Sequence, residues 1–114
     1  MKIIYNNIIP FKGFLAINLF GILFVKNKYK RFVSAKVINH ESIHTLQMKE
    51  MLYIFFYLWY FIEWVIRLFI NGKKVNRKIS YRKISFEQEA YCNDNNLEYK
   101  NKRKHFSWLK YLVN

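Results

Sequence analysis

The sequence predicts an α+β fold, formed by one small domain over residues 1–114. Apolar residues make up 53% of the chain and aromatic residues 20%, which is enough for one core at this length but not for two. β-Branched and aromatic residues dominate the first 25 positions, as is typical of strands. From position 35 onward, longer apolar segments with capping residues indicate helices. We therefore expect strands first and helices after them.

The N-terminal part is expected to form short strands. Residues 2–9 alternate weakly between apolar and polar and end at Pro10, which predicts a strand or an irregular lead-in. Two further strands are expected near 14–19 and 21–25, as a hairpin with a bulge at Gly21. The basic run that follows them predicts a solvated loop.

A long helical segment is expected next. Ser34 is a suitable N-cap for a helix that begins near Ala35, and the helical pattern continues through the apolar stretch 52–70 to an Asn-Gly pair at 71–72. A straight helix of this length would span about 54 Å, which is too long for so small a domain. We therefore expect a bend or break within 49–57.

Two helices are expected in the last third of the chain. A polar, basic loop over 73–83 brings the chain back. Ser85 and Gln88 then fit a capping box, which predicts a short helix over 86–93. After a turn, an amphipathic helix is expected over 97–112, with four buried candidates: Phe106, Trp108, Leu109 and Leu112.

The strongest chemical signal is the pentapeptide 40–44, which fits the pattern H-E-x-x-H and holds two of the three histidines. Helix positions i and i+4 share one face, so His40 and His44 can reach the same zinc ion. Glu41 lies where a general base for a zinc-bound water is needed. The sequence thus predicts Zn²⁺ as the cofactor and Glu41 as the catalytic residue. A chance glutamate between two histidines on a polar helix face is the alternative.

Zinc bound by two histidines needs a third protein ligand and one open position for water. The candidates are Glu87 and Glu89, which form an acid-rich segment in a basic chain. The residues alone leave both of them open as the third ligand. Alternatively, both acids only complement the positive N-terminus of their helix. His105 is expected to be a surface or core residue and not a ligand.

H-E-x-x-H followed by a glutamate on a second helix resembles the gluzincin group of zinc metallopeptidases, and specifically their very small forms. The resemblance covers residues 13–92 and is carried by His40, Glu41, His44 and Glu87, with Ala90 after them. It implies a small zincin-like domain that hydrolyses peptide bonds, with an edge strand within 13–25 along which a peptide substrate lies. The pattern H-E-x-x-H-x-x-Q, which ends at Gln47, is also similar to small bacterial proteins of unassigned function.

The chain departs from the gluzincin pattern at position 91. Many gluzincins carry an aspartate four residues after the glutamate ligand, where it fixes a zinc-bound histidine, but Tyr91 stands there. If Glu89 were the ligand, Asn93 would lie four residues after it and could supply a polar supporting group. The assignment of Glu89 as the third ligand therefore stays open, although we favour Glu87. Losing such a supporting group costs about 10–100-fold in affinity or activity.

Two supporting roles stay open as well. Gln47, one turn after His44, either lines the site, orients a ligand or is simply exposed. The residues that flank the candidate carboxylates, Tyr81, Arg82 and Tyr91, are candidates to stabilise the developing oxyanion, with none of them assigned.

The net charge of the chain indicates which classes of partner it can bind. The chain has 20 Lys and Arg against 7 acids, a net charge of +13, which favours anionic surfaces. No nucleic-acid-binding motif accompanies the basic residues, so no specific nucleic-acid partner is expected.

Cys92 is single, which rules out an internal disulfide and suggests a half-buried structural thiol in a reducing compartment. With Pro10 and Lys12 interrupting the first apolar stretch, no secretory signal is convincing, and a cytoplasmic location is expected.

The stretch 52–70 raises the question of a membrane. It has only two charged residues, Glu63 and Arg67, and its length is close to the ~20 residues that a membrane span requires. We expect it to be the central core helix. The alternatives are a span, or a domain that rests on an anionic membrane through its basic, aromatic-rich surface. In that arrangement the interfacial residues would be Trp59, Trp64 and Trp108.

The favoured interpretation is therefore a small, monomeric zinc-dependent metallopeptidase acting on an unidentified peptide or protein. A non-catalytic zinc-binding domain and a cationic membrane-associated protein are the alternatives.

Overall fold

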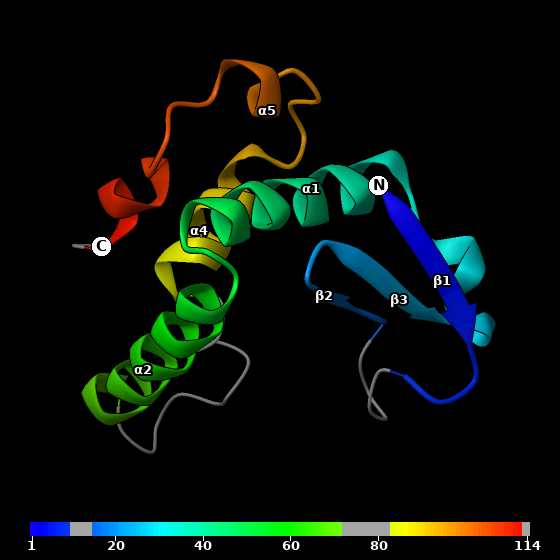
Figure 1. Cartoon of the computed structure of the whole chain (residues 1–114), viewed down its shortest axis with the longest axis horizontal. Coiled ribbons are helices and arrows are strands. Elements are labelled where there is room, and N and C mark those ends of the chain that lie inside the picture. The colour runs from blue at the N-terminus through cyan, green and yellow to red at the C-terminus, as the bar shows by residue number, and fades with distance from the viewer. Residues whose placement is uncertain (10–14, 72–82, 113–114) are drawn as a thin grey trace.

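A three-stranded sheet forms the N-terminal part of an α+β domain (Figure 1). In this computed structural model, which describes residues 1–9, 15–71 and 83–112, the strands are β1 (Lys2–Asn6), β2 (Ala16–Leu19) and β3 (Ile22–Lys26). The strand order is β1-β3-β2, with β3 parallel to β1 and antiparallel to β2. Both β1 and β2 are therefore edge strands.

The predicted hairpin is present, but the bulge predicted at Gly21 is not. Leu19 pairs with Ile22, so the register between β2 and β3 runs without interruption up to a two-residue turn. Phe20 and Gly21 both have positive φ in this turn, which matches the twist of the flanking strands. A Cβ at Gly21 would also lie 3.3 Å from Cγ2 of Thr45, so the turn packs closely on the first long helix.

The predicted helix start and bend are confirmed. Helix α1 (Ala35–Glu50) is capped by Ser34, whose Oγ accepts a hydrogen bond from the backbone N–H of Val37. The chain then turns at 51–53 and continues as α2 (Ile54–Asn71) at an angle of 109° to α1. The basic run before α1, expected as a loop, forms the 3-10 helix η1 (Asn27–Phe32).

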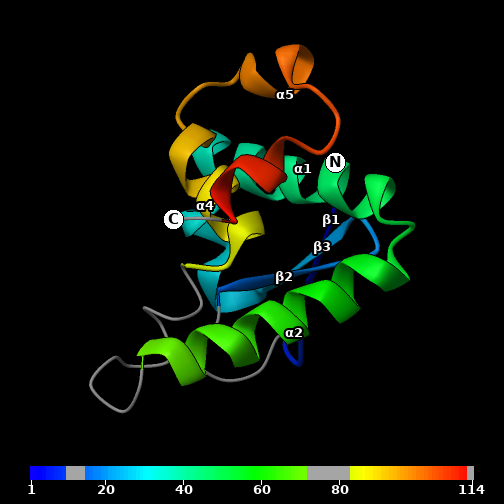
Figure 2. The ribbon, with the colours of Figure 1, turned by 90° about the vertical axis from the view of Figure 1, so that its left-hand side faces the viewer.

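Helix α2 differs from the predicted central core helix. Of its side chains that the structure describes, only Phe56 and Glu63 are buried, and eight are exposed, all of them apolar. Figure 2 shows α2 along one side of the molecule, with the short helix α5 (Tyr99–Lys102) on the opposite side. Among the described residues, no single helix is long and apolar enough to cross a bilayer, and α1 with α2 has that length and composition only as a bent pair.

The core instead forms where α1, α2 and the C-terminal segments meet. Its buried members are Met48, Phe56, Ile84, Phe86 and Trp108. The rings of Phe56 and Phe86 stack with centroids 4.5 Å apart, and Trp108 meets Phe86 edge to face at 4.7 Å. This aromatic cluster joins α2 to α4 (Ser85–Asn93), the helix that carries the candidate third ligand.

The capping box predicted at Ser85 is wrong. Ile84 is the N-cap residue and Ser85 is already helical. The Ser85 hydroxyl donates instead to Glu63 Oε1 at 2.6 Å, and the Gln88 amide donates to the carbonyl of Lys83. Glu63 is buried and needs hydrogen-bond donors, so the Ser85 hydroxyl binds its carboxylate instead of capping the helix.

The prediction of one helix over 97–112 is also wrong, because the structure has two short helices there. Helix α5 (Tyr99–Lys102) and the 3-10 helix η3 (Ser107–Tyr111) are separated by a break. Phe106 has positive φ there. Of the four buried candidates, Trp108 is buried and Leu112 packs against the core, whereas Phe106 and Leu109 are exposed. Cys92, expected to be half-buried, is exposed as well.

Candidate metal centre

Two imidazoles of α1 and one carboxylate of α4 meet in the interior. Nε2 of His40 and Nε2 of His44 lie 3.1 Å apart, and Oε1 of Glu87 lies 3.1 Å from the first and 3.0 Å from the second. All three side chains are buried. The spacing of four residues stacks the two histidines on one face of α1, and α4 packs against that face.

Hydrogen bonds outside the cluster fix the orientation of His44. Its Nδ1 lies 2.8 Å from Oε1 of Gln47. The amide group of Gln47 cannot be reversed, because its Nε2 donates to the carbonyl of Phe86 and to the carboxylate of Glu89. Nδ1 of His44 must therefore be the donor, which directs Nε2 toward the cluster.

Asp94 holds His40 in the same way. Its Oδ2 lies 3.1 Å from Nδ1 of His40, and a carboxylate can only accept, so Nδ1 donates. Asp94 itself is positioned by Asn39, whose Nδ2 donates to the backbone carbonyl of Asp94 at 2.9 Å. Asp94, seven residues after Glu87, is therefore the residue that fixes Nδ1 of His40.

The third group, Glu87, is anchored by Tyr60. The hydroxyl of Tyr60 donates to Oε2 of Glu87 at 2.8 Å, which leaves Oε1 directed at the two imidazoles. Tyr60 comes from α2, so three helices contribute to one cluster. The ring of Tyr91 covers the other side of His40, with ring centroids 4.6 Å apart and an edge-to-face arrangement.

The charges in the cluster are strongly coupled. Burial alone would lower the pKa of His44, but the attraction and hydrogen bond of Glu87 outweigh it and raise that pKa to about 9. Burial would raise the pKa of Glu87, but His44 and His40 hold it well below the usual value. The position among the two nitrogens and the oxygen therefore has to hold a positive species, which is a proton in the metal-free chain.

The spacing of the three atoms also suits zinc. Zinc bonds of about 2.0–2.1 Å in tetrahedral geometry place neighbouring donor atoms about 3.3 Å apart. The three donor atoms are separated by 3.0–3.1 Å, so a shift of a few tenths of an ångström is sufficient. His40, His44 and Glu87 are a group that could hold a metal ion.

Glu41 lies next to this cluster without belonging to it. Burial raises the pKa of its carboxyl group, while His44 and His40 lower it and Glu87 raises it further. The Glu41 carboxyl group therefore interacts electrostatically with all three cluster members. Burial with a raised pKa is the environment that suits a general base.

Glu89, the alternative third ligand, points into a different cluster. Arg103 donates to it from Nε at 2.5 Å and also binds Glu50 through Nη1 at 2.6 Å. The hydroxyl of Tyr99 donates to the same Glu89 carboxylate. His105 lies at the surface with its side chain 90% exposed. The structure therefore brings His40, His44 and Glu87 together and gives Glu89 other partners.

Comparison of the chain with protein-family models, with curated proteins and with solved structures found no match.

Sequence reasoning missed two of the supporting residues, Asp94 and Tyr60. Asp94 follows the last residue of α4, so the periodicity of that helix could not indicate its direction. Tyr60 lies in the apolar stretch, and only the bend between α1 and α2 brings it to Glu87. Of the three roles left open for Gln47, the structure excludes exposure, because Gln47 is buried and its Oε1 accepts a hydrogen bond from Nδ1 of His44. Of the three oxyanion candidates, Tyr81 and Arg82 lie outside the described residues, and Tyr91 contacts His40.

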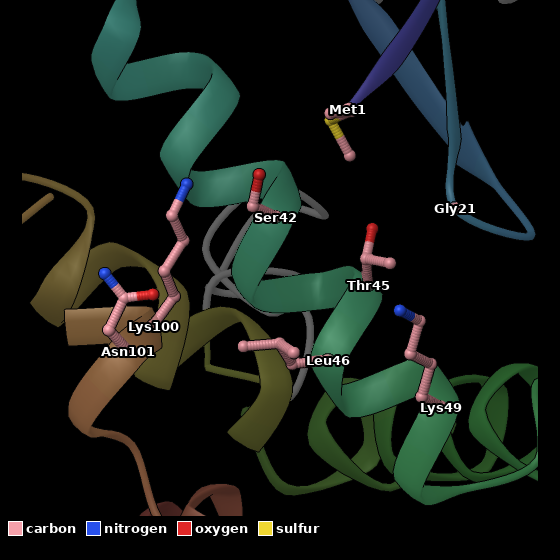
Figure 3. A pocket seen from close by; sticks show the side chains of 8 residues that line it. All are labelled: Met1, Gly21, Ser42, Thr45, Leu46, Lys49, Lys100 and Asn101. Atoms are coloured by element: carbon pink, nitrogen blue, oxygen red, sulfur yellow. The ribbon is translucent and has the colours of Figure 1, made fainter. Parts of the chain in front are cut away.

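A surface hollow of about 300 Å³ lies beside α1 (Figure 3). Figure 3 shows Ser42, Thr45 and Lys49 of α1 on one wall, with Lys100 of α5 on the other side. At about 100° per residue, these α1 residues lie on roughly the opposite side of the helix from the ligand positions 40 and 44. The hollow is next to the helix of the cluster, but its lining does not include the three ligands or Glu41.

Proposed function

We propose that this protein is a zinc-dependent hydrolase of the metallopeptidase type, with a zincin-like arrangement around its active-site helix. The observation that carries the proposal is the convergence of two oriented imidazoles and one carboxylate on a single point. His40, His44 and Glu87 are the proposed ligands, and Glu41 is the proposed general base.

The number of ligands favours catalysis over a purely structural metal. Structural zinc sites are closed by four protein ligands, whereas catalytic sites use three and leave one position for water. Within the described part of the chain, the group of potential ligands has three members. A zinc ion bound to them would polarise a carbonyl group and lower the pKa of a bound water toward ~7.

The residues of this chain then have distinct roles. Glu41 accepts the proton of the attacking water and passes it to the leaving amine, as its half-buried position and raised pKa allow. Asp94 and Gln47 keep Nε2 of both histidines directed at the metal. Tyr60 holds Glu87 in its ligating orientation.

Edge strand β2 supports a peptide as the substrate class. The side chain of Asn18 ties this strand to α1, because its Nδ2 donates to the carbonyl of Glu41 at 3.0 Å and to Thr45 at 3.1 Å. The hydroxyl of Tyr57 occupies two backbone groups of the strand, at Asn18 and Phe20. By the two-residue alternation of strands, Ala16 directs its backbone groups to the same side, where an extended peptide could pair.

The test separates metal binding from turnover. Purified wild-type protein and the Glu41→Gln variant are compared for zinc content and for cleavage of a peptide library, with products identified by mass spectrometry. We expect one zinc per chain in both proteins. The wild type should cleave peptides, and the cleavage rate of the variant should be at least about 100-fold lower.

Two results would contradict the proposal. Absence of zinc from the wild type after incubation with the metal would remove the proposed cofactor. Equal cleavage by the variant would remove the role of Glu41. One zinc per chain without cleavage by either protein would favour the non-catalytic zinc-binding alternative.

A further inference from the structure

Helix α2 carries its apolar face on the outside of the molecule. Over residues 54–69, whose side chains the structure describes, all eight exposed side chains are apolar, and at 100° per residue they cover one continuous arc of about 160°. The six most exposed are Ile54, Phe55, Leu58, Phe61, Ile66 and Phe69, each with about half or more of its surface in solvent. We name this arc the apolar face of α2.

The polar side chains of the helix lie on the opposite face, toward the protein. Tyr57 binds the backbone of β2, Tyr60 binds Glu87, and Glu63 binds Ser85. A helix that covers the core of a protein in water shows the reverse pattern, with its apolar stripe inward. Contiguous exposed apolar patches of this kind mark interaction sites.

The rest of the surface is almost free of negative charge. Six of the seven acids are buried or half-buried, and Glu98 is the single exposed acid of the sequence. In contrast, eleven Lys and Arg side chains are exposed among the described residues. The acids are engaged internally, for example Glu50 and Glu89 with Arg103, so they do not balance the surface cations.

We propose that the apolar face of α2 docks onto an anionic phospholipid bilayer, with the helix lying in the plane of the interface. A bilayer accounts for both features, because acyl chains take up the apolar side chains and acidic headgroups attract a protein whose exposed charges are almost all positive. An apolar protein partner would explain the helix face but not the nearly complete absence of exposed acids.

Docking has a consequence for the metal centre. Tyr60, on the inward face of α2, donates to Glu87, so the cluster lies about one helix diameter, ~10 Å, from the interface. Substrates would then be encountered at the membrane surface. The docking itself does not depend on a metal being bound.

The test is flotation of the full chain with lipid vesicles. Vesicles of phosphatidylcholine and phosphatidylglycerol at 7:3 are compared with phosphatidylcholine alone, at low and high salt. The triple variant Ile54→Gln, Leu58→Gln, Phe69→Gln removes exposed apolar groups while keeping good helix formers. Its matched control, Ile8→Gln, Leu97→Gln, Leu109→Gln, changes three exposed apolar side chains elsewhere.

We expect the wild type and the control to bind the anionic vesicles, and the triple variant to bind at least about tenfold more weakly. Binding to phosphatidylcholine alone should be weaker, and salt should reduce the anionic component. Circular dichroism and zinc content, unchanged in both variants, show that neither the fold nor the metal site accounts for the difference.

Three outcomes would overturn the proposal. Wild-type protein that stays out of the anionic vesicles at low salt has no such docking surface. Equal binding by the triple variant would show that charge alone causes the association. Light scattering that finds a dimer for the wild type and a monomer for the triple variant, without vesicle binding, would assign the apolar face to contact between copies.

Discussion

At the proposed zinc cluster, each imidazole is held by one hydrogen bond to a group that is not itself a ligand. Asp94 accepts from His40, and Gln47 accepts from His44. The sequence motif fixes which residues can bind metal, because helical spacing alone brings His40 and His44 to one face. It does not fix their tautomers, which depend on residues up to 54 positions away.

Replacing Asp94 should therefore weaken metal binding without removing a ligand. Asp94→Ala leaves the Nδ1 proton of His40 without its acceptor, and we expect about a 10–100-fold loss of zinc affinity, measured by competition with a chelator. The backbone carbonyl of Asp94 still accepts from Asn39, so the loop stays in place. Glu98→Ala removes an exposed acid and should leave the affinity unchanged. An unchanged affinity in Asp94→Ala would contradict the assigned role.

The coupled charges predict how zinc affinity depends on pH. His44 has its pKa raised from 6.5 to about 9 in the metal-free chain, and zinc needs the electron pair that this proton occupies. Apparent affinity should rise about tenfold per pH unit as the pH increases toward about 9 and level off above that value. The stability that the proton gives the metal-free fold is complete below 6.5 and is lost as the pH rises through about 9. Calorimetry in buffers of different ionisation enthalpy measures the released proton, and a flat profile would contradict the prediction.

At the scale of elements, the C-terminal segment shows why a regular pattern was misinterpreted. The residues over 97–112 have helical propensity, yet the helix breaks after Lys102. Arg103 is drawn inward, where it donates to both Glu50 and Glu89, and its side chain is only 3% exposed. A basic side chain in a basic segment gives no sign in the sequence that it will be buried. The charge pairing is a tertiary contact that overrides local propensity.

Replacing Arg103 should be strongly destabilising. Arg103→Met keeps most of the side-chain volume but leaves two buried carboxylates without their cation, which costs about 3–5 kcal/mol of unfolding free energy. Lys102→Met, at an exposed neighbouring position, should change it by less than about 0.5 kcal/mol. Urea denaturation monitored by circular dichroism measures both. Similar values for the two variants would show that the ion cluster contributes little.

For the whole molecule, short sequence patterns predict the order of the strands and helices but not which of their faces are exposed to solvent. The Ser34 cap, the hairpin and the bend after α1 were all predictable, because each depends on a few neighbouring residues. The apolar stretch 52–70 is predictable as a helix as well, but its composition does not show the direction of its most apolar face. Whether this face meets the core or the outside is decided by the 109° bend, which directs Tyr60 and Glu63 inward.

A zinc ion bound at the proposed site would link distant parts of the chain. His44 on α1 and Glu87 on α4 are 43 residues apart, so a metal ion that binds only the folded chain should stabilise it. At a free zinc concentration 1,000 times the dissociation constant, the gain is about 4 kcal/mol. We expect thermal unfolding of the wild type to shift upward with zinc and back with a chelator. His105→Ala, which removes an exposed imidazole, should respond like the wild type, whereas His44→Ala should show no zinc-dependent shift. A zinc-dependent shift that persists in His44→Ala would place the stabilising metal elsewhere in the chain.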